Sequence, residues 1–437
     1  MFNKPALVVL LVAVLLGITS LGPTLRQYFK VAGVFRNLPN TVLAQEDHIV
    51  YIEDTIQCED VHHHLESNQL FLACEDNYEG RFEWFPPLAK FINSSKIEHS
   101  RGSIHVVDPV IKTSRRLTFQ DFDGPFTTHG IDVISDPDST APAVFIFAVN
   151  HVPDASSCPS STSHQDCVWR ASSRIEVFRH VLGSTTANHV RTVKHPLIST
   201  PNDVLALDPN SFIITNDYYH KEGLMRHVEL LAWPLKWSTA IHVSFQHGSS
   251  LKDAEGVTAK VALDNFYNLN GLGRGRDGEV VIGRAGAGAI EFAHISPENQ
   301  TLNVFDHVQA DSTVDNPSYF ADPYADDSFD GSGYIIAGLG KAADLLHTAG
   351  DPNALDPSIV WFIPTKPGGR GPAVKAGDVT PRLMFHDDGK RIRFATTAVL
   401  VGIDPKLENG QRWGWLFVTG ALAKGAVAVK VNLEALV

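Results

Sequence analysis

The sequence contains no run of basic residues. Its 49 aspartates and glutamates outnumber its 36 lysines and arginines, which gives a formal net charge of −13 at pH 7. This balance argues against a polyanion such as nucleic acid as the partner. Charged residues make up only 19% of the chain and hydrophobic residues 43%, so a disordered protein is excluded and a globular protein with a large core is expected.

Two common hydrolase motifs are also missing. The chain has no Gly-x-Ser-x-Gly stretch, which excludes the usual serine-esterase turn, and no His-Glu-x-x-His stretch, which excludes the usual zinc-protease site. Glycine-rich stretches at 271–275 and 286–288 lack a strand–turn–helix context, so neither is interpreted as a nucleotide-binding loop. Any hydrolase chemistry must therefore come from other residues.

Cysteine is scarce, because the chain has four and none lies beyond Cys167. An even number in a chain that enters an oxidising compartment favours disulfides. Cys158 and Cys167 enclose a polar, irregular segment that cannot hold itself by packing, so we expect these two to pair, which leaves Cys58 for Cys74. A zinc site is the alternative, but neither pair has the short spacing of common zinc motifs.

Residues 1–20 contain an apolar stretch, Pro5–Ile18, that is shorter than the roughly 20 residues needed to span a bilayer. It is typical of a signal peptide or a signal anchor, and the lack of a clear cleavage site leaves both open. Residues 21–47 are expected to form a connecting amphipathic segment that can lie on a membrane. With glycosylation sequons at Asn93 and Asn299, this indicates the secretory pathway and a secreted or membrane-anchored protein.

Residues 48–437 have a different character. Short runs of β-branched and aromatic residues, such as Leu70–Ala73, Val144–Val149 and Tyr334–Gly338, alternate with clusters of glycine, proline, asparagine and aspartate. Long helical periodicity is nearly absent. This pattern is typical of β-strands joined by turns, so the region is expected to be one all-β domain.

A weak repeat divides this domain into units that begin with a polar pair, followed by an apolar stretch, a turn and a β-run. A sixth unit, from Phe394 onward, lacks the pair. Units of about 45 to 75 residues suit four-stranded blades, so we predict a six-bladed β-propeller behind the N-terminal hydrophobic helix. An all-β sandwich with chance polar pairs is the alternative. The pairs are Glu59–Asp60, His129–Gly130, Asn202–Asp203, Asn270–Gly271 and Asp315–Asn316.

These polar pairs carry the functional prediction. In a propeller the innermost strand of every blade begins at the same mouth of the central channel, so the pairs are expected to converge there. They offer carboxylate and amide oxygens without thiolates, a set that suits Ca²⁺. Any single pair is more often a turn, but the recurrence indicates a calcium site.

Several motifs in the same order resemble the serum paraoxonase and arylesterase family. They are Cys58–Val61, Thr128–Asp132, Ala148–His151, Pro201–Ala206, Thr215–Tyr219, Leu269–Leu272 and Val314–Asn316. The resemblance implies a six-bladed propeller with two calcium ions, one catalytic and one structural. The implied ligands of the catalytic ion are Glu59, Asn202, Asn270, Asp315 and Asn316. The implied ligands of the structural ion are Asp60, Asp203 and the backbone carbonyl of Ile131.

The resemblance also implies a calcium-dependent hydrolase of small lactones and aryl esters. His129 and His151 resemble the family's histidine pair, in which one imidazole takes a proton from the attacking water and the other assists. Calcium polarises the carbonyl oxygen and stabilises the charge that develops on it. The alternative is a non-catalytic, calcium-stabilised propeller that binds a partner across its rim. A propeller synthase of the strictosidine type would not need the full calcium set.

Two further features concern the blades. The family joins its first and last blades through a disulfide to the C-terminal region, and without a cysteine beyond Cys167 ring closure must rest on strand pairing. Residues 62–64 are three consecutive histidines, which point to opposite faces of a strand. We therefore interpret them as blade surface and turn rather than as a shared metal site.

Overall fold

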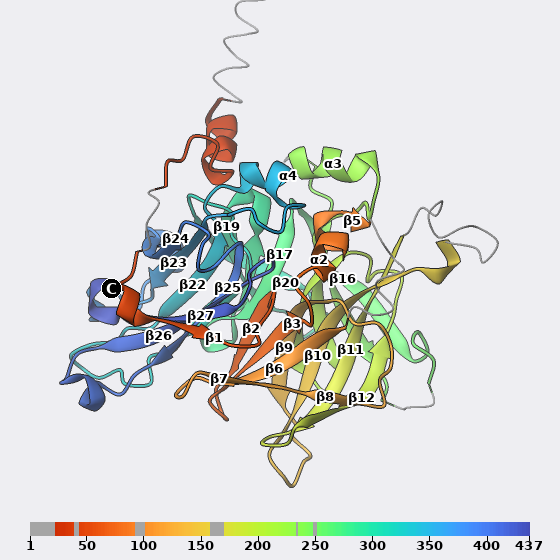
Figure 1. Cartoon of the computed structure of the whole chain (residues 1–437), viewed down its shortest axis with the longest axis horizontal. Coiled ribbons are helices and arrows are strands. Elements are labelled where there is room, and N and C mark those ends of the chain that lie inside the picture. The colour runs from red at the N-terminus through yellow and green to blue at the C-terminus, as the bar shows by residue number, and fades with distance from the viewer. Residues whose placement is uncertain (1–21, 39–42, 92–100, 158–169, 233–234, 248–250) are drawn as a thin grey trace, which may run out of the picture.

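A computed structural model describes residues 22–38, 43–91, 101–157, 170–232, 235–247 and 251–437 of the chain. It forms a six-bladed β-propeller, which confirms the fold predicted from the repeat (Figure 1). Each blade is a sheet of four antiparallel strands, and the second blade gains a fifth strand that pairs in parallel with its outermost member.

The strands of each blade run in order from the channel outward. Blade 1 contains β2 (Asp60–His64), β3 (Gln69–Glu75), β6 (Gly102–Asp108) and β7 (Thr113–Arg116). Blade 2 contains β9 (Thr128–Ser135), β10 (Ala143–Pro153), β11 (Ala171–Val181), β12 (Thr186–Val193) and β8 (Thr118–Gln120). Blade 3 contains β13 (Pro201–Asp208), β14 (Ser211–Asn216), β15 (Ser238–Phe245) and β16 (Val257–Phe266).

The remaining blades follow the same order. Blade 4 contains β17 (Leu269–Arg274), β18 (Val280–Arg284), β19 (Ala289–Ile295) and β20 (Leu302–Gln309). Blade 5 contains β21 (Pro317–Phe320), β22 (Gly333–Leu339), β23 (Ser358–Pro364) and β24 (Arg382–Asp387). Blade 6 contains β25 (Ala395–Gly402), β26 (Trp413–Gly420), β27 (Ala426–Asn432) and β1 (Ile49–Ile52).

Short elements cover the ends of the blades. The named helices are α2 (Gly80–Glu83), α3 (Leu224–Leu231) and α4 (Leu345–Thr348), and a small ribbon joins β4 (Trp84–Phe85) to β5 (Lys90–Phe91). The 3₁₀ turns are η1 (Glu46–His48), η2 (Pro86–Leu88), η4 (Ala155–Ser157), η6 (Arg276–Gly278), η7 (Ala285–Ala287), η8 (Ala342–Asp344), η9 (Pro367–Gly369), η10 (Ala376–Asp378), η11 (Pro405–Glu408) and η12 (Leu433–Ala435).

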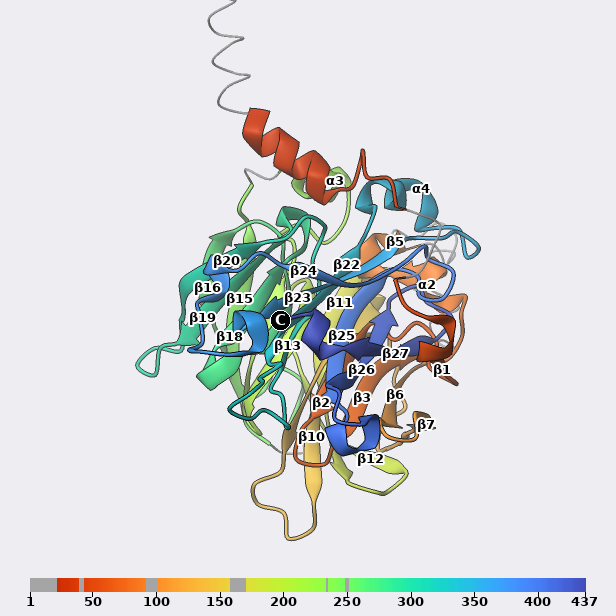
Figure 2. The same cartoon turned by 90° about the vertical axis from the view of Figure 1, so that its left-hand side faces the viewer.

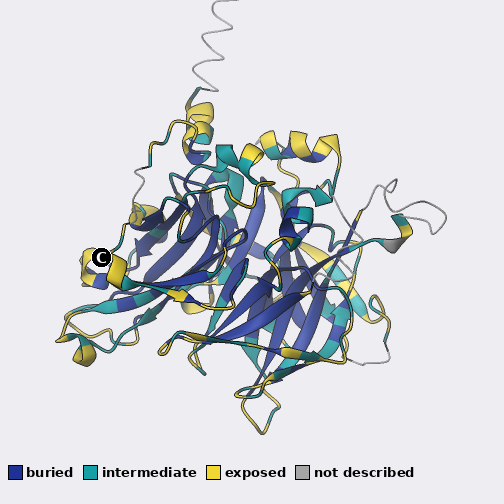
Figure 3. Cartoon of the chain, in the orientation of Figure 1, coloured by how far each residue is buried: buried dark blue, intermediate teal, exposed yellow. Residues whose placement is uncertain are grey.

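The core lies between neighbouring blades, and Figure 3 shows the buried residues along the blade strands. Six apolar clusters each join two adjacent blades. In β3, Phe71 packs toward blade 2 while Leu70 and Leu72 pack toward blade 6, because successive strand residues face opposite sides of the sheet. Both faces of a blade strand are therefore apolar, which explains the continuous β-branched and aromatic runs of the sequence.

Strand pairing closes the ring. β1 pairs antiparallel with β27, from Ile49 opposite Val429 to Ile52 opposite Ala426, so the N-terminal strand completes the last blade. The innermost strands β2, β9, β13, β17, β21 and β25 contact one another in a closed circle. Closure by pairing, expected because the C-terminal region lacks a cysteine, is thus confirmed.

We expect Ile52→Ala to weaken this closure and to lower the free energy of unfolding by about 2–5 kcal/mol. Ile52 is 2% exposed and packs in the cluster between blades 6 and 1. Denaturant titration followed by tryptophan fluorescence measures the loss. Tyr51→Ala in the same strand is the matched control, because Tyr51 is 58% exposed and its removal should change stability by less than about 1 kcal/mol. Equal stabilities for the two variants would contradict a closing role for β1.

The expected disulfide between Cys58 and Cys74 is present, and it fastens the residue before Glu59 to β3. Cys158 and Cys167 lie outside the described residues, so their pairing stays a prediction. The expected signal segment 1–20 lies outside them as well. Residues 22–31 form a helix on the same face of the propeller as α3 and α4 (Figures 1 and 2). Within the described chain, no helix combines the length and the apolar content that a membrane crossing needs.

Candidate active site

The polar pairs predicted from the repeat lie where the innermost strands begin. The residues concerned are Asp60 in β2, His129 in β9, Asn202 in β13, Asn270 in β17, and Asn316 directly before β21. Their side chains meet across blades, because the Asn316 amide donates a hydrogen bond to Glu59 Oε1 at 3.1 Å and His129 Nε2 lies 3.8 Å from the same oxygen. The structure therefore brings the pairs together at one mouth of the channel.

Five side chains at this mouth each hold a buried oxygen without a hydrogen bond from any described residue. The atoms are Glu59 Oε2 and the Oδ1 atoms of Asn202, Asn270, Asp315 and Asn316. They belong to the same five residues that the sequence predicts as ligands of the catalytic calcium. An unpaired buried oxygen costs about 1–3 kcal/mol, so five of them at one site are not explained as internal packing. The set fits a hard cation with oxygen ligands such as Ca²⁺.

The carboxyl groups at the mouth are also close enough to repel one another. Burial raises the pKa of Glu59 well above its usual value, and repulsion from Asp315 and Asp60 raises it further. Burial and the charge of Asp60 likewise raise the pKa of both Asp203 and Asp315. Burial raises the pKa of Asp60 to about 6. Four anions so close together are unfavourable unless positive charge joins them.

The residue types at the mouth decide which metals suit it. Among the described residues, no group of three or more histidine, cysteine, aspartate or glutamate side chains is arranged to hold a metal ion. Three of the five unpaired oxygens instead come from asparagine amides, which are ordinary calcium ligands. The candidate centre is thus a mixed carboxylate and amide site rather than a histidine or thiolate site.

The residues expected to bind the structural ion have different contacts. Asp60 Oδ2 accepts a hydrogen bond from the Ile131 N–H at 2.9 Å, and Oδ1 accepts one from its neighbour Val61. Asp203 accepts backbone N–H groups from Val204 and Leu272 in the same manner. Each carboxylate therefore links its own innermost strand to the next one. The ligand role expected for the Ile131 carbonyl stays a prediction.

One of the three consecutive histidines belongs to the channel rather than to the blade surface. His62 Nδ1 lies 2.8 Å from Asp132 Oδ1. Arg274 forms a two-pronged ion pair with the same carboxylate, at 2.6 and 2.7 Å. The interpretation of His62 as surface or turn is wrong, because Asp132 provides a buried partner that the local sequence does not reveal. His63 and His64 bond instead to Asn68 and to serine hydroxyls, so the three histidines share no common partner.

The two predicted catalytic histidines contact each other. His129 Nδ1 lies 3.2 Å from His151 Nε2, and His151 Nδ1 lies 2.8 Å from the Ser173 hydroxyl. The Phe85 ring packs edge-on against both imidazoles. The contacts form a chain from Ser173 through both histidines toward Glu59 at the mouth.

Both imidazoles are free bases at neutral pH. Burial lowers the pKa of His129 well below its usual value, and the neighbouring His151 and Arg81 lower it further. Burial, together with Arg81 and Arg226, lowers the pKa of His151 to about 3. An unprotonated imidazole can accept a proton from a water molecule, which is the role that the sequence predicts for this pair.

Comparison with known proteins supports the same interpretation. A family model described as Arylesterase matches residues 120–261, a segment that contains His129, His151 and Asn202. The chain is 30% identical over 162 residues to serum paraoxonase/arylesterase 2 of Gallus gallus, covering 37% of each protein. It is 30% identical over 203 residues to serum paraoxonase/arylesterase 1 of Mus musculus, covering 46% of this chain and 47% of the relative. Over these matched segments the chain resembles the paraoxonase and arylesterase family.

The matched segments span less than half the length of these two paraoxonases. The family model ends before Asn270 and Asp315. The assignment of these later residues to the site therefore rests on the structure and on the sequence motifs, not on this match. Among solved structures, a luciferin-regenerating enzyme aligns with 90% of this chain and 95% of its own length, at 11% identity and a TM-score of 0.43.

The sixth blade contributes to this site although it lacks a polar pair. Thr396 and Thr397 occupy the corresponding place in β25, and both hydroxyls donate to the backbone carbonyl of Glu59. The Thr397 hydroxyl also lies 2.8 Å from Asp60 Oδ1 and accepts from the Asn316 amide at 2.8 Å. These threonines hold the first and fifth blades' site residues in place. The two threonines stand at the start of the sixth unit, where the other units have their polar pair. A search for acids and amides alone does not find them, because threonine is neither.

Arg81 is a second residue that sequence reasoning missed. It lies in α2 with no exposed surface and donates to the Thr128 carbonyl at 2.9 Å, directly before His129. Its guanidinium lies 3.4 Å from Glu75 Oε1 and 4.4 Å from the centre of the Phe85 ring. Arg81 therefore supports both the strand and the ring that hold the histidines. No motif around position 81 pointed to this long-range contact.

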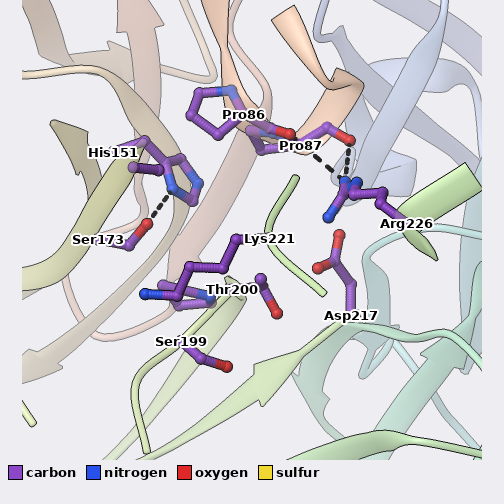
Figure 4. Close-up of a pocket in the computed structure, with 11 residues that line it drawn as sticks. Pro86, Pro87, His151, Ser173, Ser199, Thr200, Asp217, Lys221 and Arg226 are labelled. Carbon is purple, nitrogen blue, oxygen red and sulfur yellow. Dashed lines mark hydrogen bonds between the residues drawn. The ribbon is translucent and has the colours of Figure 1, made fainter. Parts of the chain in front are cut away.

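A small pocket lies beside the histidine pair (Figure 4). His151, Ser173 and Lys221 lie on one side of it, and Asp217 and Arg226 lie on the other. Burial raises the pKa of Asp217 to about 7, although Arg226 opposes this shift. His151 is among the residues that line this pocket.

Proposed function

We propose that the chain is a calcium-dependent hydrolase of lactones and aryl esters, in which His129 and His151 assist the attack of water. The observation that carries this proposal is the set of five unpaired buried oxygens beside a pair of neutral imidazoles at one channel mouth. The resemblance of the matched segments to the paraoxonase and arylesterase family supports ester chemistry on a small molecule. Neither a nucleophilic serine nor a zinc site is needed for this reaction.

Charge balance supports two calcium ions, one catalytic and one structural. Arg81 is paired with Glu75, and Arg274 is paired with Asp132. Within the described chain, no lysine or arginine forms an ion pair with Glu59, Asp60, Asp203 or Asp315. These four carboxylates carry four negative charges when ionised, which two divalent cations would neutralise. Glu59, Asn202, Asn270, Asp315 and Asn316 are proposed for the catalytic ion, and Asp60, Asp203 and the Ile131 carbonyl for the structural ion.

The chain's own residues carry the proton transfer. When bound, calcium supplies a Lewis acid that polarises the ester carbonyl and stabilises the oxyanion. One nitrogen of the histidine pair accepts a proton from the attacking water, and the contact between His129 and His151 allows the second ring to share the charge. Ser173 orients His151, and Phe85 shields both rings from bulk water. The protonated pair can then return the proton to the departing alkoxide or phenoxide.

The N-terminal segment is proposed to direct the chain to the secretory pathway and to associate with a membrane. In the helix 22–31 and the turn after it, Leu25, Phe29 and Phe35 are exposed, with 85% of Phe35 accessible. Leu224 and Leu231 of α3 are exposed on the same face of the propeller (Figure 2). Apolar side chains gathered on one face suit a lipid surface. Partition of the full chain between the membrane pellet and the soluble fraction tests this, and a wholly soluble chain would contradict it.

Hydrolysis of phenyl acetate and of a panel of aliphatic lactones, with and without a strong calcium chelator, tests the proposed activity. We expect hydrolysis to disappear in chelator and to return when calcium is restored. Chelation is also expected to lower the melting temperature, because a ligand that binds only the folded state stabilises it. Activity that chelator leaves unchanged would overturn the calcium mechanism. No hydrolysis of any ester, with calcium still bound, would favour the non-catalytic propeller.

Gly271→Ala is expected to weaken calcium binding at least about tenfold, the scale on which supporting residues change metal affinity. A Cβ at position 271 would lie 2.2 Å from Asn316 Oδ1 and 2.4 Å from the Asn316 Cα, so Asn316 must move. Calorimetric titration measures the affinity, and circular dichroism checks the fold. Gly124→Ala is the control, because its Cβ would meet only Phe122 ring atoms at 3.5 Å or more. Wild-type affinity in Gly271→Ala would contradict Asn316 as a ligand.

A further inference from the structure

Two cationic side chains line the pocket beside His151 without forming an ion pair with any described residue. They are Arg226, from α3, and Lys221, from the segment before it. Arg226 is 5% exposed, so its charge is almost fully removed from water. Arg226 lowers the pKa of Asp217 but forms no ion pair with it in the described chain. A buried cation without a close ion pair is costly.

The position of Arg226 is fixed by neutral groups. Its Nη2 donates to the backbone carbonyls of Pro87 at 2.7 Å and Pro86 at 3.4 Å, and its guanidinium stacks 3.8 Å from the centre of the Tyr218 ring. These contacts hold the guanidinium without neutralising it. Nη2 is the only one of its nitrogens with a hydrogen bond to a described residue, so the side chain keeps donor capacity for a ligand.

The remaining polar groups of the pocket also suit an anion. Hydroxyl groups of Ser173, Ser199 and Thr200 line it, and Asp217 is the single carboxyl group among the described lining residues. No lysine or arginine lies within ion-pair distance of Asp217 in the described chain. The pocket thus gathers two cations and several hydroxyls against one acid, in a chain whose net charge is −13.

We propose that this pocket binds a carboxylate of the substrate, so that the preferred substrates are esters or lactones that carry a carboxylate group. Figure 4 shows Arg226 across the pocket from His151, with Lys221 on the side of His151 and Ser173. A carboxylate held by Arg226 and Lys221 places the rest of a small substrate toward His151 and the channel mouth. Guanidinium groups bind carboxylates through charge-assisted hydrogen bonds. The inference rests on the proposed hydrolase function and adds a substrate class to it.

Three matched substrates test the proposal: phenyl acetate, 3-acetoxybenzoate and the methyl ester of 3-acetoxybenzoate. We expect kcat/KM for the carboxylate to exceed that for its methyl ester at least about tenfold, mostly through KM. Lys221→Met should remove most of this preference, by lowering kcat/KM for the carboxylate more than for phenyl acetate or the methyl ester. Lys194→Met is the matched control, because Lys194 is an exposed lysine outside the pocket lining and should keep the preference.

A binding measurement separates failure of the subsite from failure of the hydrolase. 3-Hydroxybenzoate, the product, should bind the wild-type chain in calorimetry at least about tenfold more tightly than it binds Lys221→Met, and this holds even if no ester is hydrolysed. Equal rates for the carboxylate and its methyl ester, with equal binding to wild type and Lys221→Met, would overturn the subsite while leaving the hydrolase in place. Arg226→Lys provides a second variant, in which a retained charge with altered geometry should give an intermediate affinity.

Discussion

Replacing His129 with glutamine is expected to slow ester hydrolysis about 10²–10⁴-fold, the usual contribution of a positioned general base. His129 Nδ1 lies 3.2 Å from His151 Nε2, and burial keeps both imidazoles unprotonated at neutral pH. Glutamine keeps a polar side chain of similar reach but cannot take up the proton. The oxygens proposed to bind calcium stay in place, so the melting temperature and its dependence on calcium are expected to remain close to wild type.

His151→Gln is expected to give the same pattern, and His105→Gln serves as the matched control. His105 is also buried, but it lies in the third strand of blade 1, where its ring nitrogens contact Ser103 and Ser114. Initial rates with phenyl acetate at saturating calcium, together with melting curves with and without chelator, measure both effects. If His129→Gln and His151→Gln both hydrolyse the ester at nearly the wild-type rate, the histidine pair is not the proton acceptor.

The fold could be predicted because its signals are local and repeated. Each blade needs apolar side chains on both faces of its strands, which the sequence shows directly in runs such as Val144–Val149. The polar pairs recur at the start of five of the six units, and ring geometry then requires that they meet. Closure by strand pairing was expected because the C-terminal cysteine of the resembled family is missing, but the sequence did not point to β1 as the closing strand. The prediction of the blades and of the meeting polar pairs depends only on spacing and composition, whereas the prediction of closure also depends on the family resemblance.

Other parts of the site depend on contacts that no local pattern records. Thr397 of blade 6 contacts Asp60 of blade 1, and the two residues are separated by 337 positions in the sequence. Arg81 contacts Thr128 from a short helix whose own residues follow no motif. His62 looks like part of a surface histidine run until Asp132 of the neighbouring blade is placed beside it. Each partner is chosen by the arrangement of blades rather than by its sequence neighbours.

The pocket beside His151 shows most clearly what local sequence patterns cannot predict. Its described lining residues come from several separate segments, and Arg226 enters it from a helix whose apolar residues face outward. In α3, Leu224 is 78% exposed whereas Arg226 and Glu229 are buried, which reverses the usual burial of an amphipathic helix. Sequence alone favours the opposite orientation. Only the packing of α3 over blade 3 and the Pro86–Pro87 segment shows that its charged side chains point inward.

Replacing Glu59 with glutamine is expected to lower calcium affinity about 10²-fold or more, with a parallel loss of hydrolysis. Glu59 Oε2 is one of the five unpaired buried oxygens, and glutamine removes one of only two negative charges in that set. The calcium-free protein should respond differently. Burial and repulsion from Asp315 and Asp60 disfavour a charged Glu59, so its loss should leave the melting temperature in chelator unchanged or higher.

In Glu59→Gln we therefore expect a smaller difference between the melting temperatures with and without calcium. The difference shrinks because the melting temperature of the calcium-bound form falls, whereas that of the calcium-free form does not. Glu53→Gln is the matched control, because Glu53 is exposed in the segment before the site and should change neither calcium affinity nor melting temperature. Calorimetric titration and melting curves measure both quantities.

A drop of the melting temperature in chelator would show that Glu59 holds the calcium-free fold together despite its repulsion from Asp315 and Asp60. Wild-type affinity in Glu59→Gln would remove Glu59 from the ligand set. Full hydrolytic activity as well would favour a calcium-stabilised propeller that binds a partner across its rim.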